Sequence, residues 1–199
     1  SQEEPRIGVF ICNCGINIGG VVNVPEVVEH AKTLRNVVYA EDNLYTCSQD
    51  TQIKIREKAK ELSLNRVVVA SCTPRTHEPL FRSACREAGL NHYLFEMANI
   101  REQCSWVHAH QVDKATKKAK DIVRMAVARA TWLEPQEEPE LDIKDSALVI
   151  GGGIAGMTAA LTLADQGFKV HLVEKEPELG GNLRRLHKLY PTMQDTNEI

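Results

Sequence analysis

The chain has 199 residues, of which 43% are hydrophobic, and its formal net charge is −3 at pH 7. This length suits one large domain or a domain and part of another, and the mild charge gives no reason to expect nucleic acid or an anionic membrane surface as a partner. No segment approaches the roughly 18 apolar residues of a membrane span, and the N-terminus SQEEPRIG lacks the apolar core of a signal peptide. We therefore expect a cytoplasmic protein with no membrane span.

The first two thirds of the chain alternate between short apolar runs and amphipathic stretches. The apolar runs predict buried strands at residues 6–12, 37–42, 66–71 and 92–97. The amphipathic stretches predict helices at residues 25–35, 48–62, 77–88 and 101–132, the last one broken near residues 111–113. This alternation predicts an α/β domain over residues 1–133, with a parallel sheet and helices on the sheet faces.

A change of composition follows this domain. Residues 134–145, EPQEEPELDIKD, are rich in acids and contain two prolines, which is typical of a solvated linker. Residues 146–174 then have the pattern strand, glycine turn, helix and strand, which predicts the first βαβ unit of a Rossmann-type domain. We expect this domain, residues 146–199, to be incomplete: the chain is either a piece of a longer polypeptide or a subunit that a partner completes.

The glycine turn carries the spacing of a dinucleotide-binding motif. Gly151 permits a tight turn, Gly153 lets the backbone approach a pyrophosphate, and Gly156 allows close packing of helix and strand. Glu174 ends the next strand, where its carboxylate can accept hydrogen bonds from ribose hydroxyls. A strand before the motif and a helix after it favour a dinucleotide site over a glycine turn without a ligand.

The residues after this unit favour FAD over NAD. Gly180-Gly181, with Arg184 beyond, resembles the second glycine signature of flavoproteins with two dinucleotide-binding domains, which bind FAD with their first Rossmann unit. The expected cofactor-binding residues are Gly151, Gly153, Ile154, Ala155, Gly156, Glu174, Lys175, Gly181 and Arg184.

Four of the six cysteines follow predicted strands. Cys12 and Cys14 end the first strand, Cys47 follows the second, and Cys72 directly follows the third. Because the carboxyl ends of parallel strands meet at one edge of a sheet, we expect these four thiols to lie at the same edge. In a reducing compartment, metal binding or redox chemistry explains them better than disulfides.

The cysteines alone leave the type of site open. Four thiolates suit zinc or an iron–sulfur cluster, and unrelated buried or reactive thiols are the alternative. A neighbouring flavin fold favours the cluster, because flavin and cluster exchange single electrons and zinc does not. We expect Cys85 and Cys104 to pack in the core. Arg75, His77 and Glu78 fall at the same edge, where support of the cluster or contact with a partner is the alternative to an ordinary structural role.

Several blocks of the sequence suggest a family. GVFICNCGINIGGVV, VVVASCTPRTHEPLFR, EMANIREQCSWVH, KAKDIVRMAVARA and ALVIGGGIAGMTAAL resemble the A subunit of heterodisulfide reductase, and they are similar to the A subunit of the quinone-interacting membrane-bound oxidoreductase. The resemblance covers essentially the whole chain and implies the N-terminal portion of a flavo-iron–sulfur electron-transfer subunit. It implies FAD in a domain like that of thioredoxin reductase, and one [4Fe-4S] cluster in the N-terminal domain, with Cys12, Cys14, Cys47 and Cys72 in matching blocks.

The resemblance also implies partners. In the complete complex, a hydrogenase or formate dehydrogenase module gives an electron pair to FAD, which divides it between ferredoxin and clusters leading to a disulfide. Other subunits of that complex are expected partners, and a homodimer is compatible with it. The last residues, YPTMQDTNEI, depart from the family, so the fragment alone is expected to be inactive. The alternative function is a non-catalytic docking or assembly module, with structural zinc or a cluster, completed by a partner chain.

Overall fold

The computed structural model describes residues 4–196. The chain divides into two compact units, unit 1 (Ser1–Glu138) and unit 2 (Pro139–Ile199). Their boundary falls within residues 134–145, and residues 133–144 form neither helix nor strand. Among the described residues, no helix has the length and apolar character that crossing a membrane requires.

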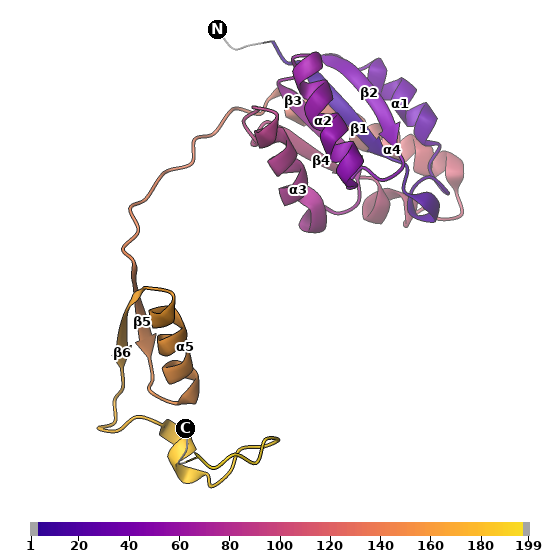
Figure 1. Cartoon of the computed structure of the whole chain (residues 1–199). Helices are drawn as coiled ribbons and strands as arrows, with labels where there is room; N and C mark the ends of the chain where they lie inside the picture. Colours follow the sequence, from indigo (N-terminus) through magenta and orange to yellow (C-terminus); the bar gives the residue numbers. More distant parts are fainter. Residues whose placement is uncertain (1–3, 197–199) are drawn as a thin grey trace. The chain divides into compact units, whose positions relative to one another are not determined.

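Unit 1 is a parallel α/β fold, which confirms the predicted fold class (Figure 1). Its strands are β1 (Ile7–Cys12), β2 (Val37–Asn43), β3 (Arg66–Ser71) and β4 (Phe95–Asn99). Its α-helices are α1 (Val24–Lys32), α2 (Gln49–Glu61), α3 (Pro74–Glu87) and α4 (Val112–Thr131). A 3₁₀ turn, η1 (Gly15–Asn17), follows β1, and a π-helical turn, η2 (Arg101–Ser105), follows β4.

The four strands have the order β2-β1-β3-β4, and all neighbours are parallel. Helices α1 and α4 cover one face of the sheet, and α2 and α3 cover the other (Figure 1). Because every strand runs in the same direction, all four carboxyl ends reach one edge. The register places Cys12 beside Asn43 and Ser71 beside Asn99 at that edge.

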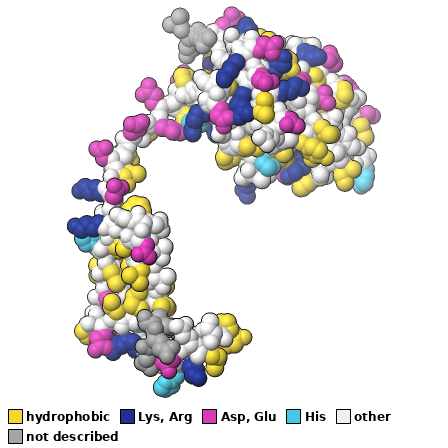
Figure 2. Space-filling view, in the orientation of Figure 1, with side chains coloured by type: hydrophobic (Ala, Val, Ile, Leu, Met, Phe, Trp, Pro, Cys, Tyr) yellow, Lys and Arg dark blue, Asp and Glu magenta, His cyan; other side chains and the backbone are white. Residues whose placement is uncertain are grey.

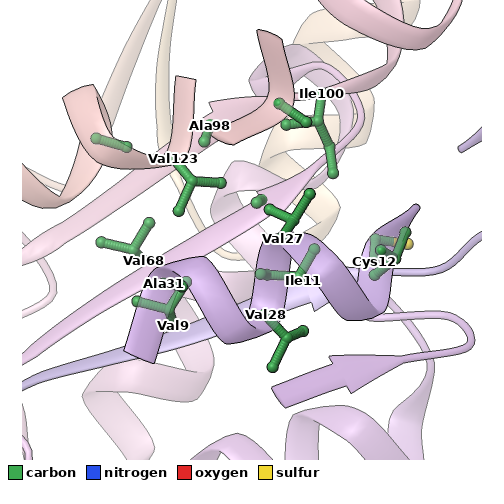
Figure 3. Packing of buried hydrophobic residues seen from close by; sticks show 14 of the residues in the cluster. Val9, Ile11, Cys12, Val27, Val28, Ala31, Val68, Ala98, Ile100 and Val123 are labelled. Atoms are coloured by element: carbon green, nitrogen blue, oxygen red, sulfur yellow. The ribbon is translucent and has the colours of Figure 1, made fainter. Parts of the chain in front are cut away.

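A hydrophobic core lies on each face of this sheet. Val9 and Ile11 point toward the side of α1 and α4, where they pack with Val123 (Figure 3). Phe10 points to the opposite side and packs in the cluster beneath α2 and α3. Every residue of β1 is buried. Burial on both faces is the usual state of a parallel sheet, and it explains why the strands are continuous apolar runs.

Helix α3 and strand β4 each begin three residues away from the start that the sequence predicts. Helix α3 begins at Pro74, three residues early, because the Thr73 hydroxyl caps it and proline suits the first turn. Strand β4 begins at Phe95 instead of residue 92, because Asn91 starts a turn in which its side chain accepts the amide of Tyr93 at 3.1 Å.

Unit 2 is a small βαβ unit. It consists of β5 (Ser146–Ile150), α5 (Ile154–Asp165), β6 (Lys169–Val173) and a 3₁₀ turn, η3 (Gly181–Arg185). Strands β5 and β6 are parallel neighbours, and α5 covers one face of the pair. On the other face Leu148 and Ile150 are 63% and 80% exposed, and Figure 2 shows hydrophobic side chains on the surface of this unit. Among its described residues, Leu183 is the single buried hydrophobic side chain.

Candidate functional site

The four cysteines that follow the strands lie at the carboxyl edge of the unit 1 sheet, and we call Cys12, Cys14, Cys47 and Cys72 the thiol edge. Cys12 is the last residue of β1, and Cys14 is the N-cap of η1. Cys47 lies in the turn between β2 and α2, and Cys72 directly follows β3. All four are free thiols. Three separate strand ends therefore bring four free thiols to one side of the domain.

The thiols of this edge act on one another electrostatically. Burial raises the pKa of the Cys14 thiol, and the neighbouring Cys12 and Cys47 raise it further. Burial also raises the pKa of the Cys72 thiol, and Cys12 adds to that effect. The guanidinium of Arg101 lowers the pKa of both Cys14 and Cys72. Several thiolates in this space would repel one another, so they need nearby positive charge.

The edge fits an electrophilic metal group in two respects. Cys14 and Cys72 are half-buried and Cys47 is exposed, so a group can reach them. In the described part of the chain, the buried Asn43 Oδ1 and Thr46 Oγ1 have no hydrogen-bond partner, and a threonine hydroxyl beside a ligand can donate to sulfur. Within residues 4–196, no three His, Cys, Asp or Glu side chains are already arranged to hold a metal ion.

Cys85 and Cys104 face the two cores instead. Burial raises the pKa of Cys85 to about 12, in the cluster beneath α2 and α3. Burial also raises the pKa of Cys104 to about 11, and its thiol donates to the carbonyl of Ala115 at 3.1 Å. Protonated thiols in apolar surroundings are chemically inert.

Sequence reasoning missed Arg101 as a member of this site. Arg101 opens η2, two residues beyond the end of β4, and its charge acts on two thiols of the edge. Arg75, which the sequence placed at this edge, is exposed on α3. The position of Arg101 in the sequence could have indicated its role. It lies just past the end of β4, as Cys72 lies just past the end of the neighbouring strand β3.

The second candidate site is the glycine loop of unit 2, residues 151–156. Gly151 has a backbone φ of +102°, a conformation that residues with side chains rarely adopt and that favours glycine. A Cβ on Gly156 would lie 1.8 Å from the carbonyl oxygen of Gly151, so the close approach of helix and strand requires glycine there too. A Cβ on Gly153 would meet nothing within 4 Å. At Gly153 the loop therefore leaves open space beside the N-terminus of α5.

Glu174 fixes this loop through its carboxylate. The carboxylate accepts the backbone amides of Gly152 at 2.6 Å, Lys175 at 2.7 Å and Glu176 at 3.0 Å. These backbone hydrogen bonds lower the pKa of Glu174, so the group is ionised at neutral pH. The sequence pattern assigned this carboxylate to ribose hydroxyls, whereas here it also ties the end of β6 to the glycine loop.

The second pair of glycines packs on the first loop. The amide of Gly180 donates to the carbonyl of Gly152 at 2.7 Å, and Gly180 forms a bridge with Gly153. Glu174, Lys175, Gly181 and Arg184 share the lining of a hollow of about 590 Å³. Arg184 forms an ion pair with Glu178.

Ile154 and Ala155 begin α5, where backbone amides have no partner within the helix. Such amides attract anions such as phosphate. All nine cofactor-binding residues expected from the sequence thus lie in the loop, the first turn of α5 or the segment after β6. The open space at Gly153 fits the close backbone approach that a pyrophosphate needs.

Comparison with known proteins agrees with this geometry. A family model for an NAD(P)-binding Rossmann-like domain matches residues 149–192. A protein of Archaeoglobus profundus, named as similar to the A subunit of heterodisulfide reductase, is 58% identical over 96% of this chain and 27% of its own length. The second iron-sulfur A subunit of the CoB–CoM heterodisulfide reductase of Methanopyrus kandleri is 59% identical over 96% of this chain and 29% of its own.

A third relative is the A subunit of the H(2):CoB-CoM heterodisulfide,ferredoxin reductase of Methanothermobacter thermautotrophicus, 55% identical over 97% of this chain and 29% of its own length. The chain thus spans less than a third of each of these relatives. Over nearly its whole length, the chain is similar to a portion of the A subunit of heterodisulfide reductase.

Proposed function

We propose that the chain belongs to an electron-transfer flavo-iron–sulfur subunit, in which the thiol edge holds one [4Fe-4S] cluster and the glycine loop binds FAD. The observation that carries the proposal is the convergence of four free thiols, from three strand ends, at one edge of unit 1. The name of the Methanopyrus relative describes that protein as an iron-sulfur subunit, which supports a cluster over zinc.

The four thiols would bind the cluster from three different strand ends. Cys12 and Cys14 anchor it to the end of β1, and Cys47 and Cys72 approach it from the loops after β2 and β3. The cluster supplies transfer of single electrons, at a potential that hydrogen bonds, charge and solvent exposure adjust. Because the ligands tie three strand–helix connections together, binding should also stabilise unit 1.

The glycine loop suits FAD for three reasons. Gly153 leaves room for the pyrophosphate, α5 directs its first amides toward it, and the ionised Glu174 stands at the end of β6. NAD-binding proteins share these features, and the choice of FAD rests on Gly180-Gly181 and Arg184. Bound FAD supplies conversion between two-electron and one-electron transfer.

The wider function follows from the longer relatives. The names of two of them describe reductases of the CoB–CoM heterodisulfide, one of them also a ferredoxin reductase. We propose that the longer parent of this chain passes electrons between FAD and clusters in such a complex, with flavin-based bifurcation. A hydrogenase or formate dehydrogenase module would be the donor and ferredoxin one acceptor. The exposed Ile16, Leu44 and Trp106 near the thiol edge suit contact with a protein partner.

The cluster is tested by anaerobic purification of the chain, with iron and acid-labile sulfide analysis and electron paramagnetic resonance after reduction. We expect about four irons per chain, with a broad visible absorbance that dithionite bleaches. Serine in place of any thiol-edge cysteine should remove most of the iron, whereas the control variant Cys85→Ala should retain it. A colourless protein with stoichiometric zinc would contradict the proposal and favour a docking module. Iron retained by Cys12→Ser or Cys14→Ser, and lost in Cys104→Ser, would contradict the ligand assignment.

A further inference from the structure

The π-helical turn η2 lies between two parts of the thiol edge. At its start, the amide of Ile100 donates to the carbonyl of Ser71 at 2.9 Å, so η2 begins beside Cys72. At its end, the hydroxyl of Ser105 donates to the carbonyl of Asn17 in η1, the turn that Cys14 caps. The backbone of η2 thus joins the loop after β1 to the end of β3. Single turns of π-helix often mark functional sites.

Arg101, the first residue of η2, is held by three neighbours. Its backbone amide donates to Asn99 Oδ1 at 3.2 Å. Its Nη2 and Nε donate to Glu102 Oε1 at 2.6 and 3.1 Å. Its guanidinium carbon lies 4.9 Å from the centre of the Trp106 ring. The side chain is about three quarters buried, so its charge is fixed in position and partly shielded from water.

Trp106 in turn is held by η1, the turn that Cys14 caps. Its indole Nε1 donates to Asn17 Oδ1 at 3.3 Å, and Asn17 donates its own amide to the carbonyl of Cys14 at 3.1 Å. A chain of contacts therefore runs from Cys14 through Asn17 and Trp106 to Arg101. Arg101 therefore lies in the turn that joins the loop carrying Cys14 to the strand end carrying Cys72.

We propose that Arg101 is a positioning residue that raises the reduction potential of the cluster at the thiol edge. The inference rests on the proposed function and adds to it the residue that sets the potential. Reduction adds one negative charge to a group already surrounded by four thiolates. A fixed positive charge stabilises the reduced form more than the oxidised form, and partial burial strengthens the interaction because screening is weak.

Glu102 should act in the opposite direction. It opposes part of the charge of Arg101 through Oε1, and it follows Arg101 in the same turn, which begins beside Cys72. Among the described residues, the buried Glu102 Oε2 has no hydrogen-bond partner, so the carboxylate is not neutralised by a second donor. The pair therefore offers two single changes that should move the potential in opposite directions.

The experiment is a redox titration of the iron-loaded chain, followed by electron paramagnetic resonance, with iron content measured in parallel. We expect Arg101→Gln to keep its iron and to shift the midpoint potential in the negative direction. Arg101→Lys, which retains the charge, should stay closer to the unmodified chain. The control Arg75→Gln removes an exposed arginine near the same edge and should shift the potential less than Arg101→Gln does.

Each outcome decides the inference. An unchanged potential in an iron-loaded Arg101→Gln, or a shift no larger than that of Arg75→Gln, overturns it. If Arg101→Gln loses its iron, Glu102→Gln decides: a positive shift supports the inference and no shift overturns it. An unmodified chain that binds no iron overturns the proposed function itself, and with it this inference, so the two failures are distinguishable.

Discussion

The two units of the chain form their sites by different means. In unit 1 every residue of β1 is buried, and the strand delivers Cys12 and Cys14 to the edge as a consequence of core packing. In unit 2 the residues of β5 alternate between exposed and half-buried, and α5 has no buried residue among those described. The glycine loop is nevertheless shaped in detail, by backbone conformation and by the hydrogen bonds of Glu174. A binding loop can thus be defined locally, whereas the thiol edge needs the whole sheet.

The largest expected difference between the units concerns side-chain burial. Phe10 is 0% exposed, so Phe10→Ala should lower the free energy of unfolding of unit 1 by about 3–5 kcal/mol. Leu161 is exposed on α5, so Leu161→Ala should change stability by less than about 0.5 kcal/mol. Denaturant unfolding of both variants, followed by circular dichroism, measures the two effects. Equal losses would mean that α5 is covered in solution, and the comparison of the units would fail.

A smaller effect separates two glycines within unit 2. Gly156→Ala places a methyl group against the carbonyl of Gly151, so we expect a loss of about 2–3 kcal/mol. Gly153→Ala meets open space at an ordinary backbone conformation and should leave the fold intact. Hydrogen exchange at the amides of β5 and β6 measures the structural effect.

FAD binding to the longer parent completes this test, because unit 2 alone is expected to bind FAD weakly. Both variants should lose FAD, but only Gly156→Ala should lose amide protection. Iron at the thiol edge should be unaffected in both, since the two units are compact separately. Full FAD retention in Gly153→Ala would show that the pyrophosphate does not approach this backbone.

The last effect develops gradually with pH and comes from an ionisable group buried in the core of unit 1. The pKa of Cys85 is about 12 in the folded chain, against an ordinary value of 9.0. Well below the ordinary value both states keep the proton, and stability does not depend on this group. Between the two values only the unfolded chain releases the proton, so the free energy of unfolding should fall by about 1.4 kcal/mol per pH unit.

Cys85→Ala provides the control for this pH dependence. It should lower stability near neutral pH by a constant amount, because it removes a buried sulfur, and should show a shallower decline at alkaline pH. Urea unfolding on either side of the ordinary thiol pKa compares the two slopes. Parallel slopes would mean that Cys85 is accessible to solvent in the folded chain.

Much of this arrangement could be predicted from the sequence. The apolar runs predicted strand β3 with its observed bounds, and the amphipathic stretch 48–62 predicted α2, where Ser48 is the N-cap and accepts the amide of Thr51. The position of the four cysteines at one edge of the sheet follows from the parallel direction of the strands alone. Features that depend on pairs of side chains were missed. The turn at Asn91 and the stacking of Arg101 on Trp106 depend on contacts that no hydrophobic period encodes.

Unit 2 illustrates the same limit. The glycine spacing predicted the loop and separate roles for Gly153 and Gly156. It could not predict that Glu174 accepts three backbone amides of its own unit, since an acidic residue at this position is equally compatible with a free carboxylate.

The open space at Gly153 has a consequence for how this protein can fail in a cell. A larger residue there would not expose the core or slow folding, so chaperones and proteases, which act on unfolded chains, would have nothing to recognise. The altered protein would accumulate at normal abundance and, under the proposed function, would enter its complex without FAD. On the same proposal, such a variant would compete with the intact subunit, whereas a variant at Gly156 would be removed with the unfolded chains.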